Sequence, residues 1–199
     1  MHILYRGAEA ILYRKDDKLV KERIRKSYRL PQLDIEIRKR RTRQEAKLLL
    51  AARRAGIKTP RVFEAEGDKL EMEFIEGKKL KDDLNDMEKK RRQEIAKKIG
   101  LILARLHETG IVHGDLTTSN MLLKDSELFL VDFGLGKFSN KIEEQAVDLY
   151  LLYEAMRSVH FKIFDEMWKI ILKIYSQNYT NAQRVLKRFE EISKRRRYA

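Results

Sequence analysis

Two short polar motifs constrain this chain more than any other feature of its sequence. The first is His113-Gly114-Asp115-Leu116-Thr117-Thr118-Ser119-Asn120, and the second, twelve residues after Asn120, is Asp132-Phe133-Gly134. Apolar runs at 121–123 and 128–131 flank the polar segment 124–127 and predict a hairpin between the motifs. Such a hairpin brings an acid, an amide and a second acid to one place, where they suit a magnesium-bound triphosphate.

Each of these three side chains has its own predicted task. Asp115 accepts or orients the proton of an attacking hydroxyl group or water molecule, Asn120 holds a magnesium ion, and Asp132 chelates the metal that bridges the phosphates. Asp-Phe-Gly alone is a weak signal, because three residues recur by chance. Both motifs in this order, after a helix that ends at Gly110, favour ATP and Mg²⁺ as ligands over the simpler interpretation of two ordinary turns.

The first part of the chain is rich in predicted strands. Its pattern predicts a hairpin of strands 9–13 and 19–24 around the turn 15–17, and further strands at 61–65 and 70–75. A capping box at Thr42-Arg43-Gln44-Glu45 predicts a helix that begins there and stops at Gly56.

The second part is rich in predicted helices. Asp86 predicts the N-cap of a long helix whose apolar residues recur at helical spacing as far as Gly110, and the pattern from Ile142 onward is again helical. We therefore predict an α+β fold with a small strand-rich lobe at residues 1–76, a helical lobe at residues 77–199, and the nucleotide cleft between them.

The two polar motifs resemble the catalytic and metal-binding loops of the protein-kinase superfamily. The resemblance implies one kinase-like domain with two lobes, a lysine on an early strand and a glutamate on the first long helix. Lys21 is the best lysine because it lies in the middle of its strand, although Lys18 and Lys26 are near it. Glu45 is the matching acid, and the sequence leaves open whether it pairs with Lys21 or serves the capping box.

The same resemblance implies that the end of the last predicted strand binds adenine. The residues at this position, by analogy with the kinase hinge, are Glu73, Phe74 and Ile75. Their own composition indicates only a strand end.

Several departures from the kinase pattern bear on the substrate. The segment Gly7-Ala8-Glu9-Ala10 has one glycine where typical protein kinases have three, and Gly114 stands where an arginine usually precedes the catalytic acid. Thr117 replaces a common lysine, and no Ala-Pro-Glu follows Gly134 before the helix that holds Asp148. An ordinary protein-substrate kinase is therefore disfavoured, and activation by a phosphorylated loop is not expected.

Five segments together resemble the small atypical kinase/ATPase subunit of the KEOPS complex in its archaeal form, over essentially the whole chain. They are Gly7 to Ala10, Lys21-Glu22-Arg23-Ile24 with Lys26-Ser27-Tyr28-Arg29, Arg41-Thr42 with Glu45-Ala46, His113 to Asn120, and Val131 to Gly136. The resemblance implies ATP hydrolysis that supports threonylcarbamoyladenosine formation on tRNA, and serine or threonine phosphorylation in isolation. It also implies binding to the threonylcarbamoyl-transferring subunit and to a small helical subunit.

Composition is compatible with a polyanionic partner. The chain of 199 residues carries 44 basic and 31 acidic side chains, a formal charge of +13, which favours RNA or an acidic protein as partner. Lys194, Arg195, Arg196 and Arg197 form a basic tail that either contacts tRNA phosphates or is a solvated helix end. Cysteine is absent and no apolar run approaches the length of a membrane span, so we expect a cytoplasmic protein.

Two other function classes stay open. One is a free-standing RIO-like kinase or small-molecule phosphotransferase, which shares the acid-and-asparagine loop. The other is a pseudokinase scaffold whose basic surface holds tRNA or a partner. The sequence does not decide the fate of the phosphate, the partner interface or the oligomeric state.

Overall fold

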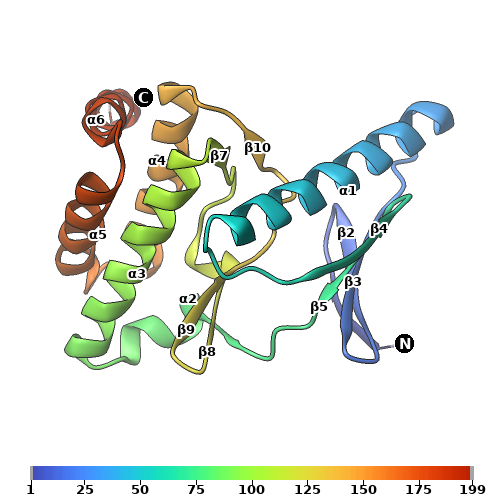
Figure 1. The fold of residues 1–199 in the computed structure, drawn as a ribbon, viewed down its shortest axis with the longest axis horizontal. Helices are drawn as coiled ribbons and strands as arrows, with labels where there is room; N and C mark the ends of the chain where they lie inside the picture. Colours follow the sequence, from blue (N-terminus) through green and yellow to red (C-terminus); the bar gives the residue numbers. More distant parts are fainter. Residues whose placement is uncertain (1, 198–199) are drawn as a thin grey trace.

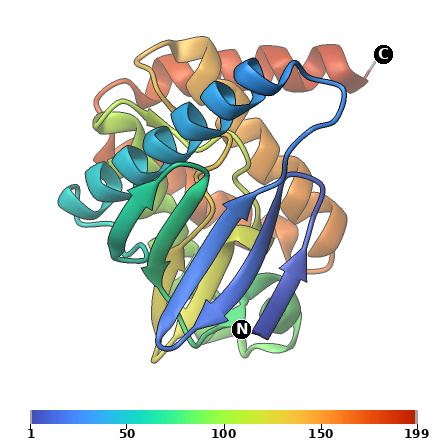
Figure 2. The same ribbon diagram turned by 90° about the vertical axis from the view of Figure 1, so that its right-hand side faces the viewer.

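The computed structural model of the chain describes residues 2–197, with side chains described as far as Arg195. Its first part is an antiparallel sheet in the order β1-β2-β3-β5-β4 (Figures 1 and 2), made of β1 (His2–Arg6), β2 (Ala10–Lys15), β3 (Lys18–Arg23), β4 (Val62–Glu66) and β5 (Lys69–Glu73). The predicted hairpin and strand pair are confirmed. The edge strand β1 was not predicted, because all five of its residues are exposed and it carries no apolar alternation.

The hairpin β2–β3 has a two-residue turn that suits the right-handed twist of its strands. Lys15 pairs with Lys18, so Asp16 and Asp17 form the turn, and Asp16 has a φ of 55°. Aspartate tolerates this left-handed conformation better than most residues. The hairpin places Val20, Lys21 and Arg23 in buried positions on β3.

Helix α1 (Pro31–Arg54) lies against β4 and β5 and begins eleven residues earlier than the capping box predicted. Its true start is Pro31. Proline fits the first turn of a helix, where the backbone N–H groups have no intrahelical hydrogen-bond acceptor. Thr42 is buried in the middle of the helix, so the predicted cap is wrong. The predicted stop is confirmed, since Gly56 follows the helix with a φ of 77°.

The second part begins with short elements and continues with four longer helices. The elements in order are β6 (Lys78–Lys79), α2 (Leu80–Asp83), the 3-10 helix η1 (Leu84–Asp86), α3 (Lys89–Glu108), β7 (Ile111–Val112), η2 (Thr118–Asn120), β8 (Met121–Lys124), β9 (Glu127–Leu130), β10 (Lys137–Phe138), α4 (Ile142–Val159), α5 (Phe164–Asn178) and α6 (Ala182–Arg197). The predicted hairpin is β8–β9. The predicted cap at Asp86 is wrong, because Asp86 belongs to η1 and α3 starts after Glu88.

The connection between the two parts runs from the end of β5 at Glu73 to the start of β6 at Lys78. The division that we propose, at Glu76 and Gly77, falls inside it. None of the helices in residues 2–197 is both long enough and apolar enough to cross a membrane.

Helices α3 and α5 pack closely at Gly100. A Cβ atom at this position would lie 2.7 Å from the Ile171 carbonyl oxygen and 2.9 Å from the Ile174 Cβ. Glycine is therefore required by the backbone of the neighbouring helix, although it weakens helix α3 by itself.

We expect Gly100→Ala to lower the free energy of unfolding by about 1–3 kcal/mol, because overpacking outweighs the gain of about 1 kcal/mol in helix propensity. Thermal and denaturant unfolding would measure the change. Lys97→Ala, at an exposed position of the same helix, is the control and should change stability by about 0.5 kcal/mol or less. A more stable Gly100→Ala variant would contradict this packing.

Candidate active site

Three elements meet at the Lys21 ammonium group. Its Nζ lies 2.7 Å from Glu45 Oε1 on α1 and 2.7 Å from Asp132 Oδ1 in the loop after β9. Glu45 therefore pairs with Lys21 and does not cap its helix. The alternative lysines are bound elsewhere, since Lys18 pairs with Glu71 at 3.0 Å and Lys26 pairs with Glu9 at 3.1 Å.

Arg23 is a second cation on Glu45 that the sequence reasoning missed. Its Nη2 donates to Glu45 Oε2 at 2.5 Å, and its side chain is only 4% exposed. Side chains two residues apart on a strand point to the same face, so Arg23 lies beside Lys21 on β3. This alternation was the signal that could have identified it.

Burial and charge act in opposite directions on this cluster. Burial alone would lower the pKa of the Lys21 ammonium, but the carboxylates of Glu45 and Asp132 outweigh it and raise that pKa. Partial burial would raise the pKa of Asp132, but Lys21 outweighs it, so that this pKa lies below its usual value. Both groups are therefore held in their charged forms.

The loop that carries Asp115 is fixed by a buried carboxylate. The backbone amides of His113 and Gly114 donate to Asp148 Oδ2 and Oδ1, each at 2.8 Å, and Asp148 is fully buried on α4. Burial would raise the pKa of Asp148, but His107, His113 and the hydrogen bond from the His113 backbone amide outweigh burial and lower that pKa. Asp148 thus stays ionised, and its carboxylate accepts a hydrogen bond from each of the two backbone amides.

Gly114 is needed for the shape of this loop. Its φ is 79°, and a Cβ atom there would lie 2.4 Å from the Leu135 carbonyl oxygen. Because an arginine cannot fit here, the departure from the kinase pattern at this position has a steric cause. The His113 ring is buried, with Nε2 3.1 Å from the Val131 carbonyl oxygen, which indicates a bracing role.

Asp115, Asn120 and Asp132 lie at the base of the β8–β9 hairpin. The Asn120 amide Nδ2 donates to the backbone oxygen of Asp115 at 2.8 Å and to its Oδ2 at 2.9 Å. The Val131 amide donates to the Asn120 backbone oxygen at 2.9 Å, which places Asp132 next to Asn120. Since Nδ2 is engaged, Oδ1 is the Asn120 atom available to a cation.

These donors fit magnesium. Mg²⁺ takes oxygen ligands and is usually held by one or two protein side chains together with substrate phosphates and water. Asn120 Oδ1 and the Asp132 carboxylate are such a pair, and Asp132 has a φ of 60°, a left-handed conformation that the Gly134 amide supports by donating to Oδ1 at 3.2 Å. Residues held in this conformation are often functional.

The loop between β1 and β2, with its single glycine, is fixed by ion pairs. Glu9 lies 2.7 Å from Arg41 on α1 and 3.1 Å from Lys26, whose Nζ also donates to the Ala8 carbonyl oxygen at 2.6 Å. These contacts hold the loop against α1 in place of the missing glycines. This role of Glu9 was not predicted from the sequence.

The remaining predicted site residues do not join this cluster through any contact of the described residues. Ile75 is buried at the predicted hinge and its carbonyl oxygen accepts from the Gly77 amide, while the Phe74 ring lies 4.6 Å from the Arg14 guanidinium. The Glu73 amide donates to the Arg61 carbonyl oxygen at 2.8 Å. Adenine binding at Glu73 to Ile75 stays a prediction.

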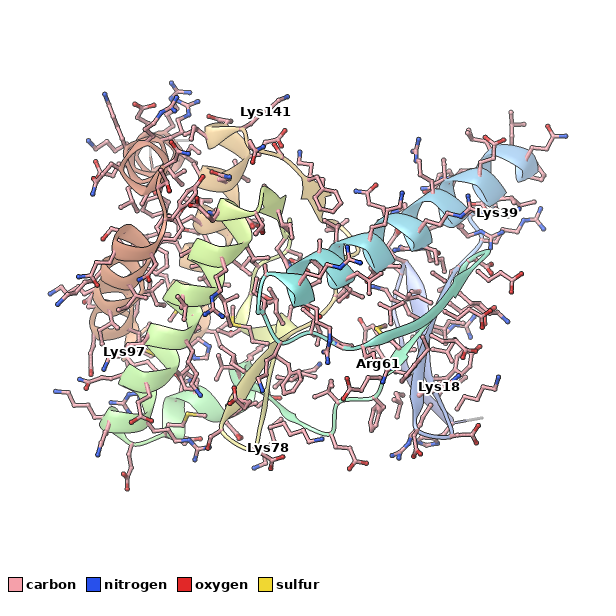
Figure 3. The ribbon with its side chains drawn as sticks, in the orientation of Figure 1. Lys18, Lys39, Arg61, Lys78, Lys97 and Lys141 are labelled. Atoms are coloured by element: carbon pink, nitrogen blue, oxygen red, sulfur yellow. The ribbon has the colours of Figure 1, made fainter. Side chains whose placement is uncertain are left out.

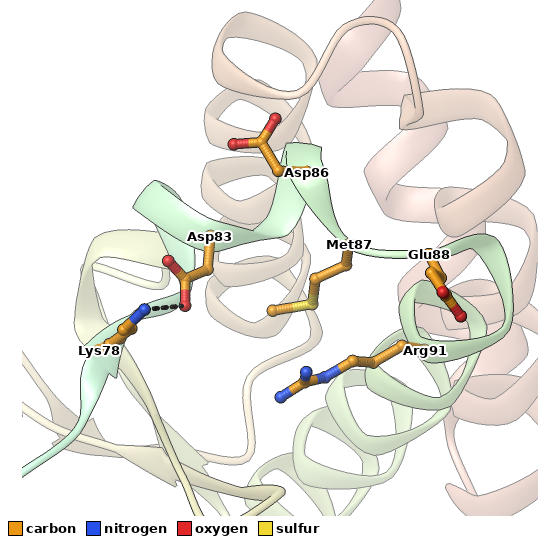
Figure 4. A pocket seen from close by; sticks show the side chains of 6 residues that line it. All are labelled: Lys78, Asp83, Asp86, Met87, Glu88 and Arg91. Carbon is orange, nitrogen blue, oxygen red and sulfur yellow. Dashed lines mark ion pairs between the residues drawn. The ribbon is translucent and has the colours of Figure 1, made fainter.

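Lys194 and Arg195 are exposed on α6, but the side chains of Arg196 and Arg197 lie outside the described residues. Contact of this tail with tRNA stays a prediction. A separate hollow lies at the start of α3, where Lys78 pairs with Asp83 at 3.6 Å (Figure 4). Its other lining residues are Asp86, Met87, Glu88 and Arg91, and none of the predicted site residues lines it.

A family model described as RIO domain matches residues 8–137. The chain is 39% identical to the KEOPS complex subunit Bud32 of Pyrococcus abyssi, covering 100% of this chain and 96% of that protein. It is 41% identical to a probable bifunctional tRNA threonylcarbamoyladenosine biosynthesis protein of Methanosarcina mazei, covering 99% of this chain but only 36% of that protein.

Two solved structures have the same fold. WaaP, in complex with acyl carrier protein, superposes with a TM-score of 0.71 at 15% identity, over 98% of this chain and 88% of that one. The Rio2 kinase of Chaetomium thermophilum, solved as an ADP/Mg²⁺-phosphoaspartate complex, has a TM-score of 0.61 at 12% identity, over 100% of this chain and 72% of that one. The predicted α+β, protein-kinase-like fold is confirmed.

We expect Glu45→Ala to lower the free energy of unfolding by about 3–5 kcal/mol. Arg23 would stay buried without the carboxylate that it pairs with, and Lys21 would keep only one of its two carboxylate partners, Asp132. Denaturant unfolding would measure the loss. Glu36→Ala, exposed on the same helix, is the matched control, with an expected change of about 0.5 kcal/mol or less. A loss at Glu45 no larger than the control would rule out the charge cluster as a structural element.

Proposed function

Because this chain belongs to the Bud32 family of RIO-domain proteins, we propose that it transfers the γ-phosphoryl group of magnesium-bound ATP, and that it does so in support of threonylcarbamoyladenosine modification of tRNA. The acceptor is a serine or threonine hydroxyl, or water, so the protein acts as an atypical kinase and an ATPase. The observation that carries this proposal is the contact of Lys21 with both Glu45 and Asp132 beside Asn120.

Each side chain of the cluster has a place in this reaction. Lys21 binds the α- and β-phosphates, and Glu45 sets the direction in which its ammonium group points. Arg23 keeps Glu45 compensated when Lys21 turns toward a nucleotide. The backbone of Glu73, Phe74 and Ile75 holds adenine.

Asp132 and Asn120 are the proposed ligands of Mg²⁺, which when bound neutralises charge on the phosphates. Asp115 orients the acceptor hydroxyl group or water and takes its proton as the oxygen attacks phosphorus and the bond to ADP breaks. Asn120 Nδ2 donates to Asp115 Oδ2, so the same residue also fixes the carboxylate that receives the proton.

No prior phosphorylation is needed in this proposal. The position before Asp115 is Gly114, whose place beside the Leu135 carbonyl oxygen leaves no room for a side chain that reads a phosphorylated loop. The segment from Gly134 to the start of α4 at Ile142 is short and contains β10. The recombinant chain should therefore bind ATP and autophosphorylate without an upstream kinase.

The proposed setting is a cytoplasmic tRNA-modifying complex. The relative from Pyrococcus abyssi is named as a KEOPS complex subunit, and the one from Methanosarcina mazei as a bifunctional biosynthesis protein. The second name favours a threonylcarbamoyl-transferring subunit as a partner. A small helical subunit and tRNA complete the proposed assembly.

We expect Asp132→Ala to abolish magnesium-dependent ATP turnover with little change in melting temperature, because the loop is exposed at Asp132 and Lys21 keeps its contact with Glu45. Lys21→Ala and Asp115→Asn should each reduce the rate by about 100-fold or more. Turnover and thermal unfolding would be measured on the same samples. Lys18→Ala is the matched control for Lys21→Ala, and a greater loss at Lys18 would refute the assignment of the phosphate-binding lysine.

ATP turnover should rise when tRNA and the transferase subunit are added together. A free-standing RIO-like kinase or small-molecule phosphotransferase would show no such rise, and a pseudokinase scaffold would show no magnesium-dependent turnover at all. Steady-state hydrolysis with each component alone and in combination separates the three. Stimulation that is equal in Asp132→Ala would point to contaminating activity and would count against the proposal.

A further inference from the structure

The basic residues of α1 fall on two faces of the helix. Arg38 contacts Asp34 and Asp68, and Arg41 lies 2.7 Å from Glu9, so the face toward the sheet and the β1–β2 loop is paired with acids. Arg38, Arg41 and Glu45 are three and four residues apart, as positions on one helical face must be.

The other face of α1 carries unpaired positive charge. Lys39, Arg40, Arg43 and Lys47 are exposed, and within the described part of the chain no carboxylate oxygen lies within 4.0 Å of their charged atoms. Lys39 and Lys47 are two turns apart, about 12 Å along the helix axis. Figure 3 shows Lys39 on the outer half of α1, away from the C-terminal helices.

A groove of about 610 Å³ runs between this face and the segment around β10. The Gln44 amide donates to the Gly136 carbonyl oxygen at 2.6 Å, which attaches that segment to α1. Phe138, 54% exposed, and Lys137 form the opposite wall. Among the described residues that line the groove, Glu36 alone is acidic, and Lys137 is the one lining cation with an acid partner, Glu144 at 3.0 Å.

We propose that this groove binds the phosphate backbone of RNA, with a base stacked on Phe138. A row of lysine and arginine side chains beside an exposed aromatic ring combines the two features that proteins use for single-stranded segments of RNA. An acidic protein would use the charges but has no need of the exposed ring. The choice of tRNA as the RNA rests on the proposed function, but the groove itself does not depend on catalysis.

The position of the groove connects it to the metal-binding loop. Gly134 and Gly136 separate Asp132 from β10, and a Cβ atom at Gly136 would lie 3.0 Å from Leu48 Cδ1 on α1. The chain between the proposed metal ligand and the RNA-binding wall is therefore short and tightly packed. RNA in this groove would lie beside the nucleotide cleft.

Binding of an unmodified tRNA transcript to the full chain tests the proposal, measured by fluorescence anisotropy at several salt concentrations. Removing Lys39, Arg40, Arg43 and Lys47 by alanine substitution should weaken binding and make the log-log salt dependence shallower by up to about three units, at about 0.7 to 0.9 per lost phosphate contact. Phe138→Ala should weaken binding by about 5- to 100-fold and leave the slope unchanged.

The matched control removes the same charge elsewhere. Lys89, Lys90, Lys97 and Lys173 are exposed on α3 and α5, and their fourfold alanine variant should keep most of the affinity and slope. Equal losses in both fourfold variants would overturn the groove in favour of diffuse attraction. If the fourfold groove variant does not fold, Arg43→Ala and Phe138→Ala decide alone, and wild-type affinity in both overturns the proposal.

Two further measurements identify the ligand and distinguish the RNA-binding proposal from the proposed function. If polyglutamate binding is lost in the groove variant while tRNA binding is kept, the groove binds an acidic protein and the RNA assignment is wrong. Asp132→Ala should keep wild-type tRNA affinity, because it removes a negative charge and not a phosphate contact. If the wild-type chain shows no ATP turnover, the proposed function is refuted but the RNA-binding groove is not. If tRNA does not bind at the groove, the groove is refuted but the proposed phosphoryl transfer is not.

Discussion

The contact of one carboxylate with two buried cations organises this molecule. Glu45 on α1 receives Lys21 and Arg23 from β3, and Lys21 in turn binds Asp132 from the loop after β9. The four side chains carry two positive and two negative charges, and their mutual attraction offsets the large desolvation cost of burying Lys21, Arg23 and Glu45. The sheet, helix α1 and the loop that carries Asp132 are fixed relative to one another by this cluster.

A second buried carboxylate fixes the loop that carries Asp115, the proposed catalytic residue. Asp148 on α4 binds the amides of His113 and Gly114, and so sets where Asp115 lies relative to the helical part of the chain. The lysine is thus positioned from the sheet and the acid from the helices. The contacts of Lys21 with Asp132 and of Gln44 with Gly136 connect the sheet and helix α1 to the loop between β9 and α4.

The sequence predicted the features that depend on local pattern. The kinase resemblance and its place in the middle of a predicted strand identified Lys21, and the hairpin between the two polar motifs identified the pairing that brings Asn120 beside Asp132. The predicted start of α1 was wrong because threonine followed three residues later by glutamate also occurs inside a helix. The role of Glu45 as the partner of Lys21 and Arg23 appears only from contacts in the folded chain. Glu9 was missed because its partner Arg41 is distant in sequence. Arg23 shares a strand face with Lys21, but its partner Glu45 is also distant, and the pairing appears only in the fold.

The ion pairs of Glu9 have a consequence for the timing of a catalytic cycle. In protein kinases the corresponding loop covers the phosphates. If the β1–β2 loop does the same here, it must separate from Lys26 and Arg41 before a nucleotide leaves, and Glu9 is about half exposed, so dissolved ions weaken both contacts. Departure of ADP would then quicken as ionic strength rises, while the buried contacts of Glu45 would hardly respond. In the proposed reaction, a higher salt concentration would in this way speed product release without altering the chemical step.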